Sequence, residues 1–221
     1  MSERGTDDDR TLREQLVATV RRLDALGLNR GSTGNVSARG SAGGGCWITP
    51  TGIGAEVTAD DLVWLGDDGC VRGAWQPSSE APFHRAIYAA RPDLQAVVHV
   101  HSTHATALAC LRRGLPAFHY MVAVAGGSNV PCTPYHLFGT EALSQAVATA
   151  FADRHACLMA NHGLVAGGTS LAHALKVTLE VESLAESYLL ALAAGEPAVL
   201  SADEMAAVIE RFKTYGQIRR S

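Results

Sequence analysis

The sequence is poor in lysine. Lys176 and Lys213 are its only two lysines, and neither lies in a motif typical of a Schiff-base nucleophile. A covalent imine mechanism therefore has no candidate residue. Basic patches with interleaved aromatic residues are also missing, and the net charge is −4, which argues against a nucleic-acid partner. The sequence contains no Walker-type or dinucleotide-binding glycine fingerprint.

C-x-x-C motifs and long apolar runs are absent as well, and we expect no secretory leader. The five cysteines are scattered, odd in number and never spaced C-x-x-C, which predicts free thiols in a reducing cytoplasm. The longest stretch without charged residues, 114–140, contains proline, glycine and polar residues and does not predict a membrane span. The first ten residues are charged and lack the apolar core of a secretory signal. We expect a cytoplasmic protein with no membrane partner.

Hydrophobic residues make up 47% of the 221 residues, are spread evenly and are not split by a Pro/Ser-rich linker. This composition predicts a single domain over residues 1–221 with a substantial core. Apolar periodicity and capping signals predict helices at 11–26, 79–90, 103–111, 141–152, 171–194 and after the capping box at 201–204. Strands are predicted at 36–38, 46–48, 62–65, near 71, at 96–101 and at 156–160. Strands with hairpin-like turns, framed by helices, indicate an α/β fold with a largely antiparallel sheet.

Two histidines, His99 and His101, lie two residues apart in the apolar run 96–101. Alternate side chains of a strand share one face, so both imidazoles can bind one divalent cation. A third candidate, His162, follows a second apolar run. A single buried histidine is more often an ordinary core residue, but burying three unpaired imidazoles is unfavourable. The pattern favours zinc or a similar ion, with Glu80 as a fourth candidate ligand and an open position typical of catalytic sites.

Small polar residues and glycines lie at three predicted turns. Their N–H groups and hydroxyls suit an anion, and the predicted helix that opens at Ser79 has an N-terminus that favours negative charge. Taken singly, each is an ordinary turn or cap. Beside the carboxylate of Glu80, they favour a phosphate-bearing substrate next to the metal. The residues are Gly34, Asn35, Thr51, Gly52, Ser78 and Ser79.

The remaining histidines give weaker signals. His84 lies four residues after Glu80 on one helical face, so the two could chelate a metal. We expect instead that His84 packs within the fold or bonds a main-chain carbonyl. His104 follows the histidine strand, and we expect it to hydrogen-bond to the metal ligands without binding the metal itself. The others are interpreted as structural: His119, His136, His155 and His173.

Short segments spread in order over almost the entire chain match one known family. They are GLNRGSTGNVS (27–37), ITPTGI (48–53), PSSE (77–80), RPD (91–93) through His101, HYM (119–121), AGG (125–127), FGT (138–140), NHGL (161–164) and FKTYG (212–216). In these segments the chain resembles the class II, metal-dependent sugar-phosphate aldolases of the fuculose-phosphate aldolase type. That family shares its fold with ribulose-phosphate 4-epimerases.

The resemblance implies roles for the residues of the predicted site. His99, His101 and His162 would hold one Zn²⁺, or a similar divalent ion, per subunit. Glu80 would be a ligand in the resting enzyme and a base once substrate displaces it. The six small turn residues would bind the phosphate of a sugar phosphate.

The resemblance also implies an assembly and an architecture. The family forms fourfold-symmetric homotetramers with active sites between subunits. Tyr120 and Tyr215 would each reach the active site of a neighbouring subunit, where Tyr120 would act as a proton donor. Tyr215 follows the apolar face of the last predicted helix, so packing is nearly as good an explanation for it. The implied fold is a three-layer α/β/α domain around a mostly antiparallel sheet.

The implied reaction is reversible cleavage of a ketose 1-phosphate, such as fuculose 1-phosphate, to dihydroxyacetone phosphate and a small aldehyde such as lactaldehyde. Two alternatives on this fold are 4-epimerisation of a pentulose 5-phosphate and dehydration of a thio-sugar phosphate. The epimerases place an aspartate after the position of His119, whereas this sequence has Tyr120, which favours cleavage. A non-catalytic assembly domain of the adducin-head kind would lack the metal histidines, and all three are present.

Overall fold

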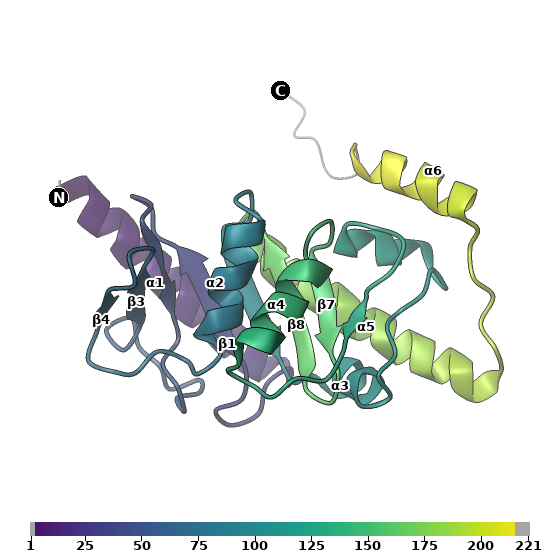
Figure 1. The fold of residues 1–221 in the computed structure, drawn as a ribbon, viewed down its shortest axis with the longest axis horizontal. Helices are drawn as coiled ribbons and strands as arrows, with labels where there is room; N and C mark the ends of the chain where they lie inside the picture. The colour runs from purple at the N-terminus through teal and green to yellow at the C-terminus, as the bar shows by residue number, and fades with distance from the viewer. Residues whose placement is uncertain (1–2, 215–221) are drawn as a thin grey trace.

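The computed structural model describes residues 3–214, which form one mixed sheet with helices around it (Figure 1). The helices are α1 (Glu3–Ala25), α2 (Ala81–Ala90), α3 (Thr103–Cys110), the 3-10 helix η1 (Tyr120–Ala125), α4 (Glu141–Ala150), α5 (Leu171–Ala194) and α6 (Ala202–Phe212). The strands are β1 (Asn35–Arg39), β2 (Gly45–Ile48), β3 (Val63–Gly66), β4 (Val71–Arg72), β5 (Ala96–Val100), β6 (Cys132–Thr133), β7 (Ala156–Met159) and β8 (Gly163–Gly168).

The eight strands lie in the order β4-β3-β2-β1-β5-β8-β7-β6. Every described neighbouring pair is antiparallel except β6 with β7. The central strand β5 pairs with β1 on one side and β8 on the other. The predicted α/β fold with a mostly antiparallel sheet is therefore confirmed.

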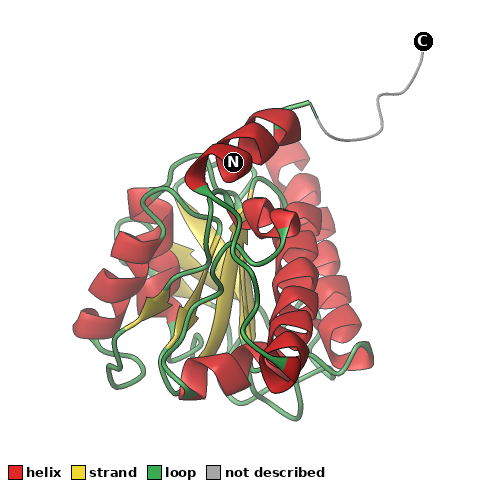
Figure 2. Cartoon of the chain, turned by 90° about the vertical axis from the view of Figure 1, so that its right-hand side faces the viewer, coloured by secondary structure: helices red, strands yellow, loops and turns green. Residues whose placement is uncertain are grey.

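Helices cover both faces of the sheet, which gives three layers (Figure 2). Alternate residues of β5 point to opposite faces because successive side chains of a strand alternate. Val98 packs in the core formed with α1, α3 and α5, whereas Val97 packs in the core formed with α2 and α4. All five residues of β5 are buried, since both faces of this strand are covered. The sheet therefore holds the end of β5 rigidly, and that end carries the paired histidines.

Several element predictions were wrong in part. The strand β8 was not predicted, and neither were the short β6 and the helix η1. Helix α2 begins at Ala81, so Ser79 does not open it; Glu80 occupies the N-cap position. Helix α1 begins at Glu3 rather than near residue 11, because residues 4–10 are polar and add no apolar stripe to the pattern.

The last helix, α6, lies apart from the three layers and packs on the η1 region through Met205 (Figure 1). Its predicted capping box is confirmed. The Ser201 hydroxyl accepts a hydrogen bond from the Glu204 main-chain N–H at 3.2 Å, and the Glu204 carboxylate accepts one from the Ser201 N–H at 2.7 Å. All five cysteines are free, as predicted. Within residues 3–214, no helix is both long and apolar enough to cross a membrane.

Candidate metal centre and phosphate pocket

Three imidazoles meet where β5 ends and β8 begins. His99 lies on β5, His101 directly follows its last residue, and His162 directly precedes β8. The antiparallel register pairs Val100 with Leu164, which brings these strand ends together. One ring nitrogen from each histidine lies within 4.8 Å of those of the other two. The structure thus assembles the predicted histidine cluster from segments some sixty residues apart in sequence.

The hydrogen bonds of His99 show which nitrogens face the cluster. Its Nδ1 lies 2.9 Å from the main-chain oxygen of Leu164. A carbonyl oxygen only accepts, so Nδ1 carries the proton and a neutral ring presents a lone pair at Nε2. That Nε2 lies 3.0 Å from Nε2 of His101, and burial, followed by the charges of its neighbours, lowers the pKa of His101 to about 4. The Nε2 atoms of His99 and His101 therefore face each other at a distance at which one cation could bind both.

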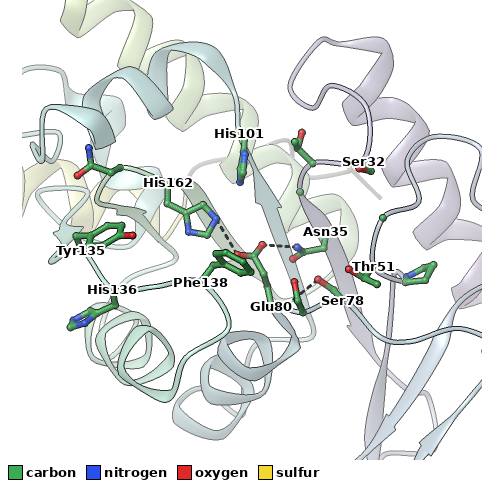
Figure 3. A pocket seen from close by; sticks show the side chains of 16 residues that line it. Ser32, Asn35, Thr51, Ser78, Glu80, His101, Tyr135, His136, Phe138 and His162 are labelled. Carbon is green, nitrogen blue, oxygen red and sulfur yellow. Dashed lines mark hydrogen bonds and ion pairs between the residues drawn. The ribbon is translucent and has the colours of Figure 1, made fainter.

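Glu80 completes the cluster. Its side-chain oxygens lie 3.1 Å from Nε2 of His99 and 3.0 Å from Nε2 of His162 (Figure 3 shows the His162 contact). The oxygen Oε1 is buried, and apart from this contact with His162 it has no hydrogen-bond partner in the described structure. Burial raises the pKa of the Glu80 carboxyl, but the partners His99 and His162 lower it by more, so it lies well below its usual range.

This donor set fits a divalent cation. Three imidazole nitrogens and a carboxylate oxygen converge at this point. A cation bound to neutral imidazoles would supply the positive charge that an ionised, buried carboxylate requires. Nitrogen and oxygen donors suit zinc and similar ions, and none of the five cysteines lies in the cluster.

A pocket of about 330 Å³ adjoins the cluster, and Figure 3 shows the side chains that line it. Glu80, His101 and His162 form one wall, while His99 is fully buried behind them. All six residues predicted to bind phosphate line the pocket: Gly34, Asn35, Thr51, Gly52, Ser78 and Ser79. The structure therefore brings together both groups of residues that the sequence singled out.

Gly34 shows why this wall needs glycine. Its φ is +74°, and a Cβ there would lie 2.6 Å from the main-chain oxygen of His99 and 2.5 Å from the side chain of Asn29. Real Cβ atoms do not approach so closely, so any larger residue would displace the strand that carries the metal histidine. Asn29 is itself part of the support, because its Oδ1 accepts a hydrogen bond from the His101 N–H at 3.2 Å.

Two histidines beside the cluster contact distant side chains. His84 packs within the fold, as expected, and its ring nitrogens contact side chains rather than a main-chain carbonyl, Nε2 that of Asn35 and Nδ1 that of Ser37. The Nδ1 of His104 lies 2.9 Å from the Glu182 carboxylate on α5, not against a metal histidine. Neither partnership has a sequence signal, because the partners lie far away along the chain.

Glu182 was missed as a site-supporting residue. Its carboxylate accepts hydrogen bonds from the Ser102 hydroxyl at 2.6 Å and from the main-chain N–H groups of His104 and Ala105 at 2.9 Å. It therefore caps α3 from another helix, in place of the N-cap residue Ser102, whose side chain accepts no such bond. This cap anchors the chain immediately after His101.

Among the described residues, those lining the pocket do not include Tyr120. Tyr120 lies on η1, is 48% exposed and contacts the ring of His119. Tyr215 lies outside the described residues. Seven lining residues were not predicted as site residues, three of them beside the predicted turns and four in the loop before α4 and the β7–β8 turn: Ser32, Thr33, Pro50, Tyr135, His136, Phe138 and Asn161. The interpretation of His136 as purely structural was therefore wrong.

Comparison with known proteins adds independent evidence. Residues 14–189 match the family model described as Class II Aldolase and Adducin N-terminal domain. The chain is 48% identical over 206 residues to a 5-methylthioribulose-1-phosphate/5-deoxyribulose-1-phosphate aldolase of Rhodospirillum rubrum, which covers 93% of this chain and 92% of that protein. It is 47% identical over 207 residues to the L-fuculose phosphate aldolase of Escherichia coli K12, covering 93% and 95%.

A solved structure of an L-fuculose 1-phosphate aldolase superposes with a TM-score of 0.88 at 40% identity, covering 92% of this chain and 96% of that chain. These relatives share the fold and span nearly the whole chain. The chain therefore belongs to the class II aldolase and adducin N-terminal domain family, and it is an enzyme of the family's metal-dependent aldolases, which are lyases.

Proposed function

We propose that this enzyme reversibly cleaves a ketose 1-phosphate to dihydroxyacetone phosphate and a small aldehyde such as lactaldehyde. The observation that carries the proposal is the junction of a three-imidazole, one-carboxylate cluster with a pocket rimmed by small polar turns. The relatives' names support the reaction class, since they describe aldolases of fuculose phosphate and of 5-methylthioribulose and 5-deoxyribulose 1-phosphates. These two relatives are named as aldolases, which favours cleavage over both alternatives.

His99, His101 and His162 would hold Zn²⁺ or a similar divalent ion, with Glu80 as the fourth ligand in the resting site. A bound ion of this kind supplies a Lewis acid, which polarises a carbonyl and stabilises negative charge on its oxygen. The three imidazoles leave room for substrate because only Glu80 needs to move.

The pocket residues would then orient the substrate. Hydroxyls of Thr51, Ser78 and Ser79 and the main chain around Gly34 and Gly52 offer hydrogen bonds to phosphate oxygens. Fixing the phosphate would fix the position of the reacting carbons relative to Glu80. Binding of the phosphate would thus orient the rest of the substrate.

Glu80 would act as the base. In the condensation direction its carboxylate takes a proton from the carbon beside the carbonyl; the C–H bond breaks and its electron pair passes to the carbonyl. In the cleavage direction the same carboxyl returns that proton. The residue is only 8% exposed, which keeps water from competing for the proton.

Tyr120 and Tyr215 would complete the site in a homotetramer. The exposed position of Tyr120 is consistent with a contact to a neighbouring subunit, where its hydroxyl would protonate the alkoxide formed at the aldehyde carbon. In this arrangement each active site would combine the pocket of one subunit with a tyrosine of the next.

The direct test is a product assay on the zinc-loaded protein. L-Fuculose 1-phosphate, 5-deoxyribulose 1-phosphate and 5-methylthioribulose 1-phosphate are each incubated with enzyme, and dihydroxyacetone phosphate is measured by enzymatic reduction. Release of the triose phosphate together with an aldehyde from at least one ketose supports the proposal. An epimerised or dehydrated product without triose phosphate contradicts it.

A further inference from the structure

A buried line of polar side chains leads away from Glu80 into the protein. The Glu80 Oε2 atom accepts a hydrogen bond from Nδ2 of Asn35 at 2.9 Å (Figure 3). The other end of that amide, Oδ1 of Asn35, lies 2.5 Å from Nε2 of His84. All three side chains are buried, and His84 is fully inaccessible to solvent. The line continues beyond His84, where Nδ1 lies 2.7 Å from the Ser37 hydroxyl, which in turn lies 2.8 Å from the Tyr88 hydroxyl.

The chemistry of these groups fixes the direction of each hydrogen bond. An ionised carboxylate only accepts, so the Asn35 amide must present its NH₂ group to Glu80 and its oxygen to His84. The oxygen only accepts, so His84 must carry its proton on Nε2. Burial and the nearby His99 lower the pKa of His84 to about 3, so the ring is neutral. Its Nδ1 therefore accepts from the Ser37 hydroxyl, which accepts from the Tyr88 hydroxyl.

Each group in this line thus has a fixed donor or acceptor role, and the Nε2–H group of His84 determines the orientation of the Asn35 amide. Without a donor at its Nε2 position, the amide of Asn35 could rotate and place its oxygen against the carboxylate, where two acceptors repel each other. Glu80 would then lose the hydrogen bond that Asn35 donates to its Oε2 atom. The second hydrogen of Asn35 Nδ2 remains available to the pocket, which Asn35 also lines.

We propose that His84 is a positioning residue: as the Nε2–H tautomer it holds the Asn35 amide with its NH₂ group toward Glu80, so that the carboxylate keeps this donor when it leaves the ion and acts as the base. This inference rests on the proposed role of Glu80 as a base. His84 touches neither the pocket nor the metal histidines through a hydrogen bond, so its effect passes through Asn35. Residues that orient a ligand or base in this way commonly change activity by about 10- to 100-fold.

The test compares two substitutions of His84, one without and one with an N–H donor. His84→Phe keeps a ring that can stack on Phe83, whose centroid lies 4.7 Å from that of His84, but it removes the donor. His84→Gln keeps an N–H donor. The measurement is the exchange of a C–H proton of dihydroxyacetone phosphate with deuterium in D₂O, catalysed by the zinc-loaded enzyme. This exchange reports proton transfer by Glu80 without the aldehyde half of the reaction.

We expect His84→Phe to lower the maximal exchange rate about 10- to 100-fold, with an unchanged zinc content and a half-saturating concentration within about threefold of wild type. His84→Gln should restore the rate to within about fivefold of wild type. A His84→Phe enzyme that folds, binds zinc and exchanges at the wild-type rate overturns the proposal. So does a glutamine variant as slow as the phenylalanine variant.

A measurement on the unaltered protein covers the case in which His84→Phe fails to fold. Long-range ¹H–¹⁵N correlation spectra of histidine-labelled, zinc-loaded protein distinguish the two tautomers. We expect the His84 ring to carry its proton on Nε2 between pH 6 and 8; a proton on Nδ1, or on both nitrogens, overturns the proposal. If wild-type enzyme neither exchanges the proton nor cleaves any ketose 1-phosphate, the role of Glu80 as a base fails, while these spectra still report on the locked amide.

Discussion

The Nδ1 atom of His99 and the main-chain oxygen of Leu164 lie 2.9 Å apart, across the pair of strands β5 and β8. This one hydrogen bond sets both the tautomer and the orientation of the most buried imidazole of the cluster. Its acceptor belongs to the sheet, so the ring cannot turn without disrupting the strand pair. The pairing of the central strands β5 and β8 therefore fixes the orientation of His99 in the candidate metal centre.

Substitution of Gly163 should disturb this geometry. A Cβ on Gly163 would lie 2.6 Å from the main-chain oxygen of Val100, 3.0 Å from the His101 ring and 3.3 Å from the His99 ring. Neither a strand carbonyl nor a tightly held ring can move cheaply, so we expect Gly163→Ala to weaken zinc binding at least tenfold and to destabilise the protein by about 1–3 kcal/mol. Zinc affinity is measured by competition with a chromogenic chelator.

Gly195→Ala is the matched control for that substitution. Gly195 follows α5, its φ of 162° is extended backbone, and nothing lies within 4 Å of the position of an added Cβ. Zinc affinity should be unchanged and stability should stay within about 0.5 kcal/mol of wild type. Equal effects of the two alanines would contradict the argument from close approach.

Removal of the Glu182 carboxylate should destabilise the protein. Glu182→Ala would leave the N-terminal N–H groups of α3 and the Ser102 hydroxyl without their acceptor. We expect a loss of about 2 kcal/mol in the free energy of unfolding, measured by urea denaturation of the zinc-loaded protein. Glu186→Ala on the same helix is exposed and should change stability by less than about 0.5 kcal/mol. The prediction fails if the two variants are equally stable.

The buried, neutral ring of His84 should make stability depend on pH. Burial lowers its pKa from 6.5 to about 3 in the folded protein, whereas the unfolded chain titrates near 6.5. The unfolded state therefore binds more protons between these values, so stability rises with pH there and is lost as pH falls below about 6.5. Between pH 7 and pH 5, wild type should lose about 2 kcal/mol more than His84→Phe. Parallel pH profiles for the two proteins would contradict this.

Much of the candidate site could be predicted from the sequence because local signals mark it. The spacing of two histidines in a strand and the presence of small polar residues at turns can be recognised without knowing the long-range contacts of the chain. The structure places these residues together around one pocket. Capping signals located α6 correctly for the same reason, since Ser201 and Glu204 are three residues apart.

What escaped prediction depends on contacts between distant segments. Strand β8 contains three glycines, which weaken a strand pattern. The structure explains all three. Gly163 approaches Val100 and the histidine rings, as described above; a Cβ on Gly167 would lie 2.8 Å from the Leu94 side chain, and one on Gly168 would lie 2.3 Å from the main chain of Ala174. The small residues that hid β8 are thus those that let it pack closely. The partners of His84 and Glu182 were hidden because no spacing along the chain encodes them.

The most direct measurement of the central claim is the metal content of purified, zinc-equilibrated protein, measured together with its turnover of a ketose 1-phosphate. The account predicts about one divalent ion per chain in the wild type, and loss of both the ion and activity in His99→Ala, His101→Ala and His162→Ala. His155→Ala, which removes a half-buried histidine away from the pocket, should retain both. Wild-type protein that turns over substrate without bound metal, or alanine variants of the three histidines that remain fully active, would contradict the account.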